Sequence, residues 1–98
     1  MFNITAKELE EKLLAKEELH LIDVREEEEV MTGKIPGAVH IPLNSLITNI
    51  NELDKSKSYI LICHSGGRSG MAKQLMEMNG FTAINMVDGM VGWNGPIE

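Results

Sequence analysis

One short segment of the chain contains residue types that could carry out covalent chemistry: Cys63-His64-Ser65-Gly66-Gly67-Arg68-Ser69. Cys63 is the only cysteine in the protein. A lone cysteine is most often a small buried apolar side chain. A thiolate, however, is a strong nucleophile, and it is favoured by surrounding backbone N–H groups and by the positive end of a helix. A cysteine followed by a glycine turn and a helix therefore predicts a reactive thiol.

The other residues of this segment can support a sulfur anion in several ways. Gly66 and Gly67 are expected to adopt positive φ values, which would turn N–H groups toward the sulfur. Arg68 is expected to bind an anionic sulfur donor or to orient the loop, because a cation in the first turn of a helix is otherwise unfavourable. Ser69 can donate a hydrogen bond to the sulfur, cap the helix, or do both. His64 can contact a donor or face the solvent.

The flanking sequence predicts the elements that hold this segment in place. Residues 58–63 are mostly apolar, which predicts a buried strand that ends at Cys63. Residues 71–79 have apolar side chains at helical spacing, and Gly80 follows at the position typical of a C-terminal glycine. The candidate nucleophile thus lies between a strand and a helix.

A second candidate group follows another predicted strand, residues 19–24. This run is short and aliphatic, as is typical of a strand buried on both faces in a parallel sheet. Asp23 and Arg25 lie at its carboxyl end, where functional groups of α/β sheets gather. The acidic run 26–29 that follows is interpreted as a solvated helical turn.

Predicted helices and strands alternate along the rest of the chain. Thr5 and Glu8 form a capping-box pattern, which with the apolar spacing predicts a helix from Ala6 to Lys16. This alternation predicts an α/β fold with a mainly parallel sheet, formed as one domain by residues 1–98. The remaining predicted elements are an edge strand at 2–4, a strand at 39–42, a helix at 43–50, a helical turn within 51–58, a strand at 83–86 and a short helix within 88–93.

Composition and charge narrow the function classes. The formal net charge of −6 argues against nucleic acid or an anionic membrane as a partner. No apolar run is long enough to span a bilayer, and no export signal is visible at the N-terminus. A single cysteine forms no internal disulfide, so a cytoplasmic location is the default expectation. The three histidines and one cysteine show no metal-ligand spacing, and no metal or other cofactor is predicted.

Four motifs, in order along residues 22–93, resemble those of a single-domain rhodanese, a sulfurtransferase family. They are Ile22-Asp23-Val24-Arg25, Gly33-x-Ile35-x-Gly37-Ala38-x-x-Ile41-Pro42, Cys63 to Ser69, and Val87-Asp88-Gly89 followed by Trp93. Each motif alone is a weak signal, whereas the four together at this spacing are specific. The family usually has a second glycine after Gly89, where this chain has Met90.

The resemblance implies a rhodanese-like fold, in which a five-stranded, mainly parallel sheet has helices on both faces and the active loop over its carboxyl edge. It also implies that Cys63 accepts sulfane sulfur from thiosulfate or a persulfide and passes it to cyanide, a small thiol or a protein thiol. In the family pattern, Asp23 helps to hold the loop and Arg25 makes a supporting ion pair. A cysteine thiolate agrees with this chemistry, because a covalent intermediate divides the transfer into two easier steps.

Two other functions fit the same residues. A regulatory or sulfur-relay module would use the cysteine to pass sulfur to a partner or to sense oxidation. A phosphatase or arsenate reductase would need a larger loop, because four residues separate Cys63 from Arg68 and the cysteine phosphatase signature has five. The shorter loop suits one sulfur atom better than a tetrahedral phosphate. The intact Cys63 and the uninterrupted loop favour an active sulfurtransferase over the regulatory module.

Overall fold

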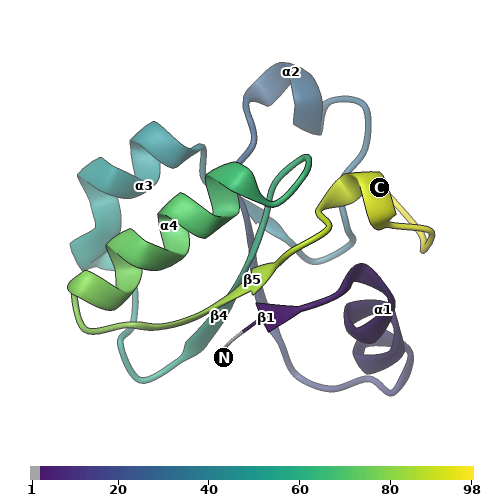
Figure 1. Ribbon diagram of the computed structural model, residues 1–98, viewed down its shortest axis with the longest axis horizontal. Helices are drawn as coiled ribbons and strands as arrows, with labels where there is room; N and C mark the ends of the chain where they lie inside the picture. Colours follow the sequence, from purple (N-terminus) through teal and green to yellow (C-terminus); the bar gives the residue numbers. More distant parts are fainter. Residues whose placement is uncertain (1–2) are drawn as a thin grey trace.

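A computed structural model describes residues 3–98, in which helices and strands alternate (Figure 1). Within these residues, five strands form one sheet in the order β1-β5-β4-β2-β3, and every neighbouring pair is parallel. The prediction of an α/β fold with a parallel five-stranded sheet is therefore confirmed. The strands are β1 (Asn3–Ile4), β2 (His20–Asp23), β3 (Val39–His40), β4 (Ser58–Ile62) and β5 (Thr82–Met86). The helices are α1 (Ala6–Leu14), α2 (Glu27–Val30), α3 (Leu43–Asn49) and α4 (Gly67–Met78), with the 3₁₀ turns η1 (Ile50–Glu52) and η2 (Met90–Gly92).

The strand that leads to the candidate nucleophile, β4, lies at the centre of the sheet. Its side chains alternate between two cores, with Tyr59 and Leu61 in one and Ile60 and Ile62 in the other. Successive side chains of a strand point to opposite faces, so both faces of β4 must be covered. All four side chains are buried, as the uninterrupted apolar run predicts.

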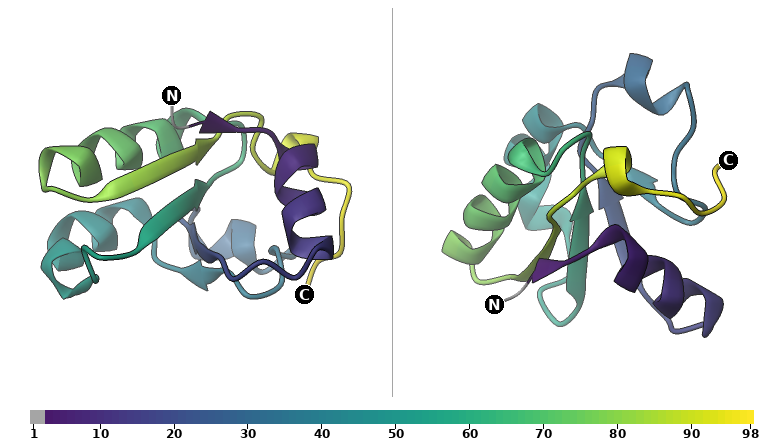
Figure 2. Two further views of the ribbon diagram at one scale, coloured as in Figure 1. Left: turned by 90° about the horizontal axis from the view of Figure 1, so that it is seen from below. Right: turned by 45° about the vertical axis from the view of Figure 1, so that its right-hand side comes forward.

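Helices cover both faces of the sheet, as the left view of Figure 2 shows. α3 and α4 pack on one face, where Leu46, Ala72 and Met76 join the first core. α1 covers the opposite face, where Ala6 and Leu9 join the second core. The predicted arrangement of helices on both faces is confirmed, and it leaves the ends of the strands as the place where polar groups can gather.

The first helix, α1, begins where predicted and ends before Lys16. The Thr5 hydroxyl accepts a hydrogen bond from the Glu8 N–H at 3.1 Å, and the Glu8 carboxylate accepts one from the Thr5 N–H at 2.8 Å. Lys16 adopts φ = 60°, and its N–H and that of the next residue donate to carbonyls of the last helical turn. These bonds form a Schellman motif, which ends the helix at Leu14 although lysine is a good helix former.

Most other boundaries lie within two residues of the predicted ones. The predicted edge strand forms β1, and Phe2 of that prediction lies outside the described residues. The exception is α4, which begins at Gly67 although the helical spacing predicts a start at Met71. No helix within residues 3–98 is both long and apolar enough to cross a membrane.

The carboxyl ends of the central strands bring the candidate residues together at one edge of the sheet. Asp23 ends β2, Cys63 directly follows β4, and Asn85 lies near the end of β5. The segment after β4 lies between α2 and η2 in Figure 1 before it enters α4. The parallel sheet thus places several segments that are distant in the sequence around Cys63.

Candidate active site

The turn between β4 and α4 is shorter than the sequence predicts. α4 begins at Gly67, so Arg68 and Ser69 belong to its first turn. Gly66 precedes the helix with φ = 97°, a conformation that glycine adopts at little cost. Glycine and serine are poor helix formers, and for this reason local propensity does not reveal the true start of the helix. The earlier start brings the free N–H groups and positive dipole of the helix close to Cys63.

The sulfur of Cys63 lies beneath this turn and has two hydrogen-bond partners in it. The Gly66 N–H donates to Sγ at 3.0 Å, and the Ser69 hydroxyl lies 3.3 Å from Sγ. Burial, the largest single influence, raises the pKa of the thiol, since the residue is only 1% exposed. Hydrogen bonds from the Ser69 hydroxyl and from the N–H groups of Ser69, Gly66 and Ser65 outweigh it, and the pKa of Cys63 falls below its ordinary value. The arrangement therefore favours the nucleophilic thiolate.

Asn85 completes this hydrogen-bond network, although it belongs to none of the sequence motifs. Its side-chain Oδ1 accepts a hydrogen bond from the Ser69 hydroxyl at 2.5 Å, so Oδ1 and the Cys63 sulfur share the single hydroxyl proton. Its Nδ2 donates to the Gly66 carbonyl at 3.3 Å. Asn85 thus contacts both residues that form hydrogen bonds with the sulfur. The N-cap residue of α4 is Gly66 and not Ser69. The signal in the sequence is a polar residue inside an apolar strand, because a buried amide needs hydrogen-bond partners.

The turn that follows β5 supports the back of the loop. The N–H groups of Met90 and Val91 donate to the carbonyls of Cys63 and His64, at 2.9 and 3.0 Å. Gly89 lies so close to the loop that a Cβ atom there would be 2.4 Å from the His64 carbonyl oxygen. The conformation of the loop therefore depends on a close backbone contact with the C-terminal part of the chain.

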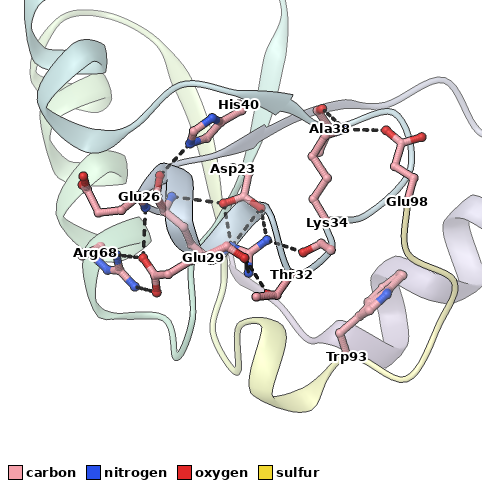
Figure 3. A network of polar contacts seen from close by, with 12 residues as sticks. Asp23, Glu26, Glu29, Thr32, Lys34, Ala38, His40, Arg68, Trp93 and Glu98 are labelled. Atoms are coloured by element: carbon pink, nitrogen blue, oxygen red, sulfur yellow. Dashed lines mark hydrogen bonds and ion pairs between the residues drawn. The ribbon is translucent and has the colours of Figure 1, made fainter.

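Arg68 extends from α4 toward α2 and binds Glu29 with both of its terminal nitrogens (Figure 3). The two hydrogen bonds measure 2.6 and 2.7 Å, and the contact lowers the pKa of Glu29 to about 2 and raises that of Arg68. The sequence indicates a solvated helical turn at residues 26–29. The helical turn is present, but Glu29 pairs with Arg68 and is not simply solvated. Of the two roles expected for Arg68, the structure shows an orienting contact, and donor binding stays a prediction.

Asp23 and Arg25 form a buried ion pair, and Figure 3 shows Asp23 beside the Arg68–Glu29 contact. The Arg25 Nε donates to both Asp23 oxygens at 2.9 and 3.0 Å, and Nη2 donates to Oδ2 at 2.8 Å. Arg25 also donates to the carbonyls of Glu29 and Gly33. Within residues 3–98, the Asp23 carboxylate forms hydrogen bonds only with Arg25. Its predicted support of the loop is therefore indirect, because Arg25 contacts Glu29, and Glu29 in turn binds Arg68.

His64 and Ser65 are exposed at the top of the loop. Two hollows meet at His64, and their walls differ in chemistry. The first has a volume of about 350 Å³ and acidic walls, and its lining includes Glu28 and Glu29. The second has a volume of about 440 Å³, and its lining includes the apolar residues Met90, Val91 and Trp93 beside polar ones such as Thr32 and Asn94. Among the described residues, no group of His, Cys, Asp and Glu side chains is arranged to hold a metal ion.

The same fold occurs in a known family. Residues 5–96, nearly the whole chain, match the Rhodanese-like domain family. The chain belongs to the rhodanese-like family. The resemblance that the four motifs indicate is thereby confirmed. The segment Cys63 to Ser69 follows β4 at the carboxyl edge of the sheet, and its role as the active loop stays a prediction.

Relatives within the rhodanese-like family are named for sulfur chemistry. The chain is 46% identical over 92 residues to "Putative sulfurtransferase YtwF" of Bacillus subtilis, which covers 94% of this chain and 89% of that protein. It is 43% identical over 96 residues to "Putative sulfur carrier protein YrkF" of the same organism, covering 97% of this chain and 52% of that protein. A crystal structure of a rhodanese-like domain protein from Staphylococcus aureus superimposes with a TM-score of 0.93 at 36% identity, over 100% of this chain and 97% of that one.

Met90 lies where the resemblance leads us to expect a glycine, and the local backbone accommodates it. Gly89 adopts φ = 60°, whereas Met90 begins η2 without a positive φ. Only Gly89 therefore needs the conformational freedom of glycine. The Met90 side chain lines the second hollow beside His64.

The two glycines of the loop are expected to respond differently to alanine. Gly66→Ala places a Cβ 2.2 Å from the Val87 carbonyl oxygen at φ = 97°, and should cost about 2–4 kcal/mol of unfolding free energy through strain and overpacking. Gly67, contrary to expectation, has no positive φ, and a Cβ there meets nothing within 4 Å. Gly67→Ala should therefore be neutral or stabilise by up to about 1 kcal/mol. Urea unfolding of both variants measures the difference, and equal losses would contradict this account of the loop.

Removal of the Ser69 hydroxyl is expected to raise the pKa of Cys63. The hydroxyl donates to the charged form of the sulfur, and loss of such a donor favours the neutral thiol. The rate of Cys63 alkylation by iodoacetamide should therefore shift to higher pH in Ser69→Ala. Ser65→Ala is the matched control, because Ser65 acts on the sulfur through its backbone N–H. An unshifted profile in Ser69→Ala would show that the hydroxyl does not stabilise the thiolate.

The same hydrogen bonds make the stability of the fold depend on pH. The pKa of Cys63 is lower in the folded than in the unfolded protein. The hydrogen bonds to the thiolate therefore contribute fully to the free energy of unfolding above the unfolded pKa of about 8.5. This contribution is lost as the pH falls through the folded pKa. Within this window the free energy of unfolding should rise with pH in the wild-type protein. The rise should be smaller in Ser69→Ala, since its two pKa values lie closer together.

Proposed function

We propose that this chain is a sulfurtransferase that carries sulfane sulfur on Cys63 as a persulfide. The observation that supports the proposal most directly is the position of Sγ, 3.0 Å from the Gly66 N–H and 3.3 Å from the Ser69 hydroxyl at the N-terminus of α4. Such donors stabilise a sulfur anion both before and after sulfur is loaded. The names of the two Bacillus subtilis relatives agree with this chemistry.

In the first half-reaction, the Cys63 thiolate attacks the outer sulfur of a thiosulfate or persulfide donor. A bond forms between Sγ and that sulfur, and the bond from that sulfur to the rest of the donor breaks. The bonding electron pair leaves with sulfite or with the donor thiolate. The positive end of α4 and the Gly66 N–H then stabilise the charge on the persulfide.

In the second half-reaction, a thiophilic acceptor attacks the terminal sulfur of the persulfide. Cyanide, a small thiolate or a protein thiolate forms the new bond, and the electron pair of the broken S–S bond returns to Cys63. The thiolate is regenerated, and no external oxidant or reductant is consumed. The reaction needs a reduced cysteine, which is in line with the proposed cytoplasmic location.

Intact-mass measurement tests this proposal. The purified protein is exposed to thiosulfate or to N-acetylcysteamine persulfide, freed of excess donor and weighed. We expect the mass to increase by one sulfur atom, and cyanide should then restore the original mass and yield thiocyanate. If neither donor adds sulfur to the wild-type protein, the proposal is wrong.

A sulfur-relay module is the second candidate, and one observation favours it. One relative is named as a sulfur carrier, and this chain spans about half of its length. A relay module would load sulfur but pass it to a protein thiol much faster than to cyanide. Comparison of the two acceptors with the loaded protein separates the candidates.

The contact made by Arg68 argues against a phosphatase or an arsenate reductase. Such an enzyme needs a guanidinium that faces the bound oxyanion. Both terminal nitrogens of Arg68 instead bind the Glu29 carboxylate. Together with the short loop, this contact supports transfer of a single sulfur atom.

A further inference from the structure

Both arginines beside the loop are already paired with carboxylates. Arg68 binds Glu29 through two hydrogen bonds of 2.6 and 2.7 Å, and Arg25 binds Asp23 in the buried ion pair. Glu29 stays ionised throughout the working pH range, because its pKa lies at about 2. Neither guanidinium is therefore free to balance the charge of an incoming anion.

The first hollow beside His64 keeps one unpaired negative charge in its wall. Its lining includes Glu28, Glu29 and Arg25. Arg68 balances Glu29 and Asp23 balances Arg25, whereas Glu28 has no ion-pair partner among the described residues. Two like unit charges 4 Å apart repel by about 1 kcal/mol in water and by about 4 kcal/mol near a protein surface. Thiosulfate carries two negative charges and releases a dianion, sulfite, so it is disfavoured here at binding and again as it reacts.

The second hollow offers a different kind of surface. It shares His64 and Arg25 with the first, but Met90, Val91 and Trp93 add apolar surface to it, and no carboxylate of residues 3–98 lines it. A donor of the form R–S–SH, with an uncharged group R, can place R against these side chains. Its leaving group is a thiolate with a single charge, which demands less cationic stabilisation than sulfite.

We propose that Glu29 is a specificity-determining residue: by holding Arg68, it selects persulfide donors with an uncharged group next to the sulfur over thiosulfate. This inference rests on the proposed sulfurtransferase function and narrows its donor class. The Cys63 thiolate attacks the terminal sulfur of R–S–SH, the Sγ–S bond forms, and the S–S bond of the donor breaks. The electron pair leaves with R–S⁻, and the proton stays on the terminal sulfur of the new persulfide.

The variant Glu29→Gln tests the inference, because it keeps the shape of the side chain and releases the charge of Arg68. Steady-state kinetics are measured with thiosulfate and with N-acetylcysteamine persulfide, a donor without charge on R. We expect the ratio of kcat/KM for thiosulfate to that for the persulfide to rise about tenfold or more. The rise should come mainly from a lower KM for thiosulfate, and it should shrink at high ionic strength.

The matched control is Glu27→Gln, which removes one charge from the same helix. Glu27 is exposed and is not a partner of Arg68, so we expect the donor ratio to change less than about twofold. An equal rise in both variants would overturn the inference, since net charge and not the release of Arg68 would then be responsible. An unchanged ratio in Glu29→Gln, or a loss of turnover with both donors, would also overturn it. A wild-type protein that accepts sulfur from neither donor would instead refute the proposed function itself.

Discussion

Replacement of Cys63 by serine is expected to abolish sulfur transfer, with a fall in the single-turnover rate on the order of 10,000-fold or more. Serine keeps the size of the side chain, but its hydroxyl is a poor nucleophile without an adjacent base. Its oxygen also forms no stable equivalent of the persulfide. Release of sulfite or thiol from the donor measures the rate, and intact mass shows whether sulfur has been added.

Cys63→Ala serves as the matched variant for this experiment. Both variants should remain folded, because the loop is also held by backbone bonds from Met90 and Val91 that do not involve the sulfur. Unfolding in urea verifies this. The protein has no other cysteine, so activity above about 1% of the wild-type rate in either folded variant would show that Cys63 does not carry the sulfur.

The largest expected loss of stability follows replacement of Arg25 by methionine. The Asp23 side chain is fully buried, and Arg25 is its only side-chain partner among the described residues. A buried ion pair that loses one member leaves an uncompensated charge, which costs about 3–5 kcal/mol. A domain of this size has a total stability of only about 5–15 kcal/mol. Urea unfolding should therefore show a large decrease in the midpoint.

The double variant Asp23→Leu with Arg25→Met separates the charge effect from lost packing. Removal of both charges should restore part of the stability, so the double variant should be more stable than Arg25→Met alone. The restoration should be incomplete, because Arg25 also donates to the carbonyls of Glu29 and Gly33. A single variant within about 1 kcal/mol of wild type would contradict the structural role assigned to this pair.

Local patterns in the sequence predicted most of the elements correctly. The apolar run of β4 and the capping box at Thr5 each depend on neighbouring residues, so their consequences can be read from short windows. The errors arose where the backbone conformation departs from what the residue types favour. Gly67 begins α4 although glycine is a poor helix former, and Lys16 adopts a left-handed conformation at the end of α1.

The candidate site was also predictable only in part. Cys63 and its loop were identified because the nucleophile, the glycines and the start of the helix are adjacent in the chain. Asn85 was missed, since it reaches Gly66 from 19 residues away and belongs to no motif. Glu29 was assigned to the solvent, since its partner Arg68 lies 39 residues further along the chain.

The sequence by itself determined that the lone cysteine follows a central strand of a parallel α/β sheet in a rhodanese-like chain. Hydrophobic periodicity, turn residues and motif order suffice for that conclusion, because they are properties of local segments. Only the tertiary structure decided which charges surround the sulfur. Arg68 pairs with Glu29, and Asn85 contacts Ser69, because parallel strands bring segments that are distant in the sequence to one edge of the sheet. The spacing of residues within a short segment does not predict which distant segments meet there.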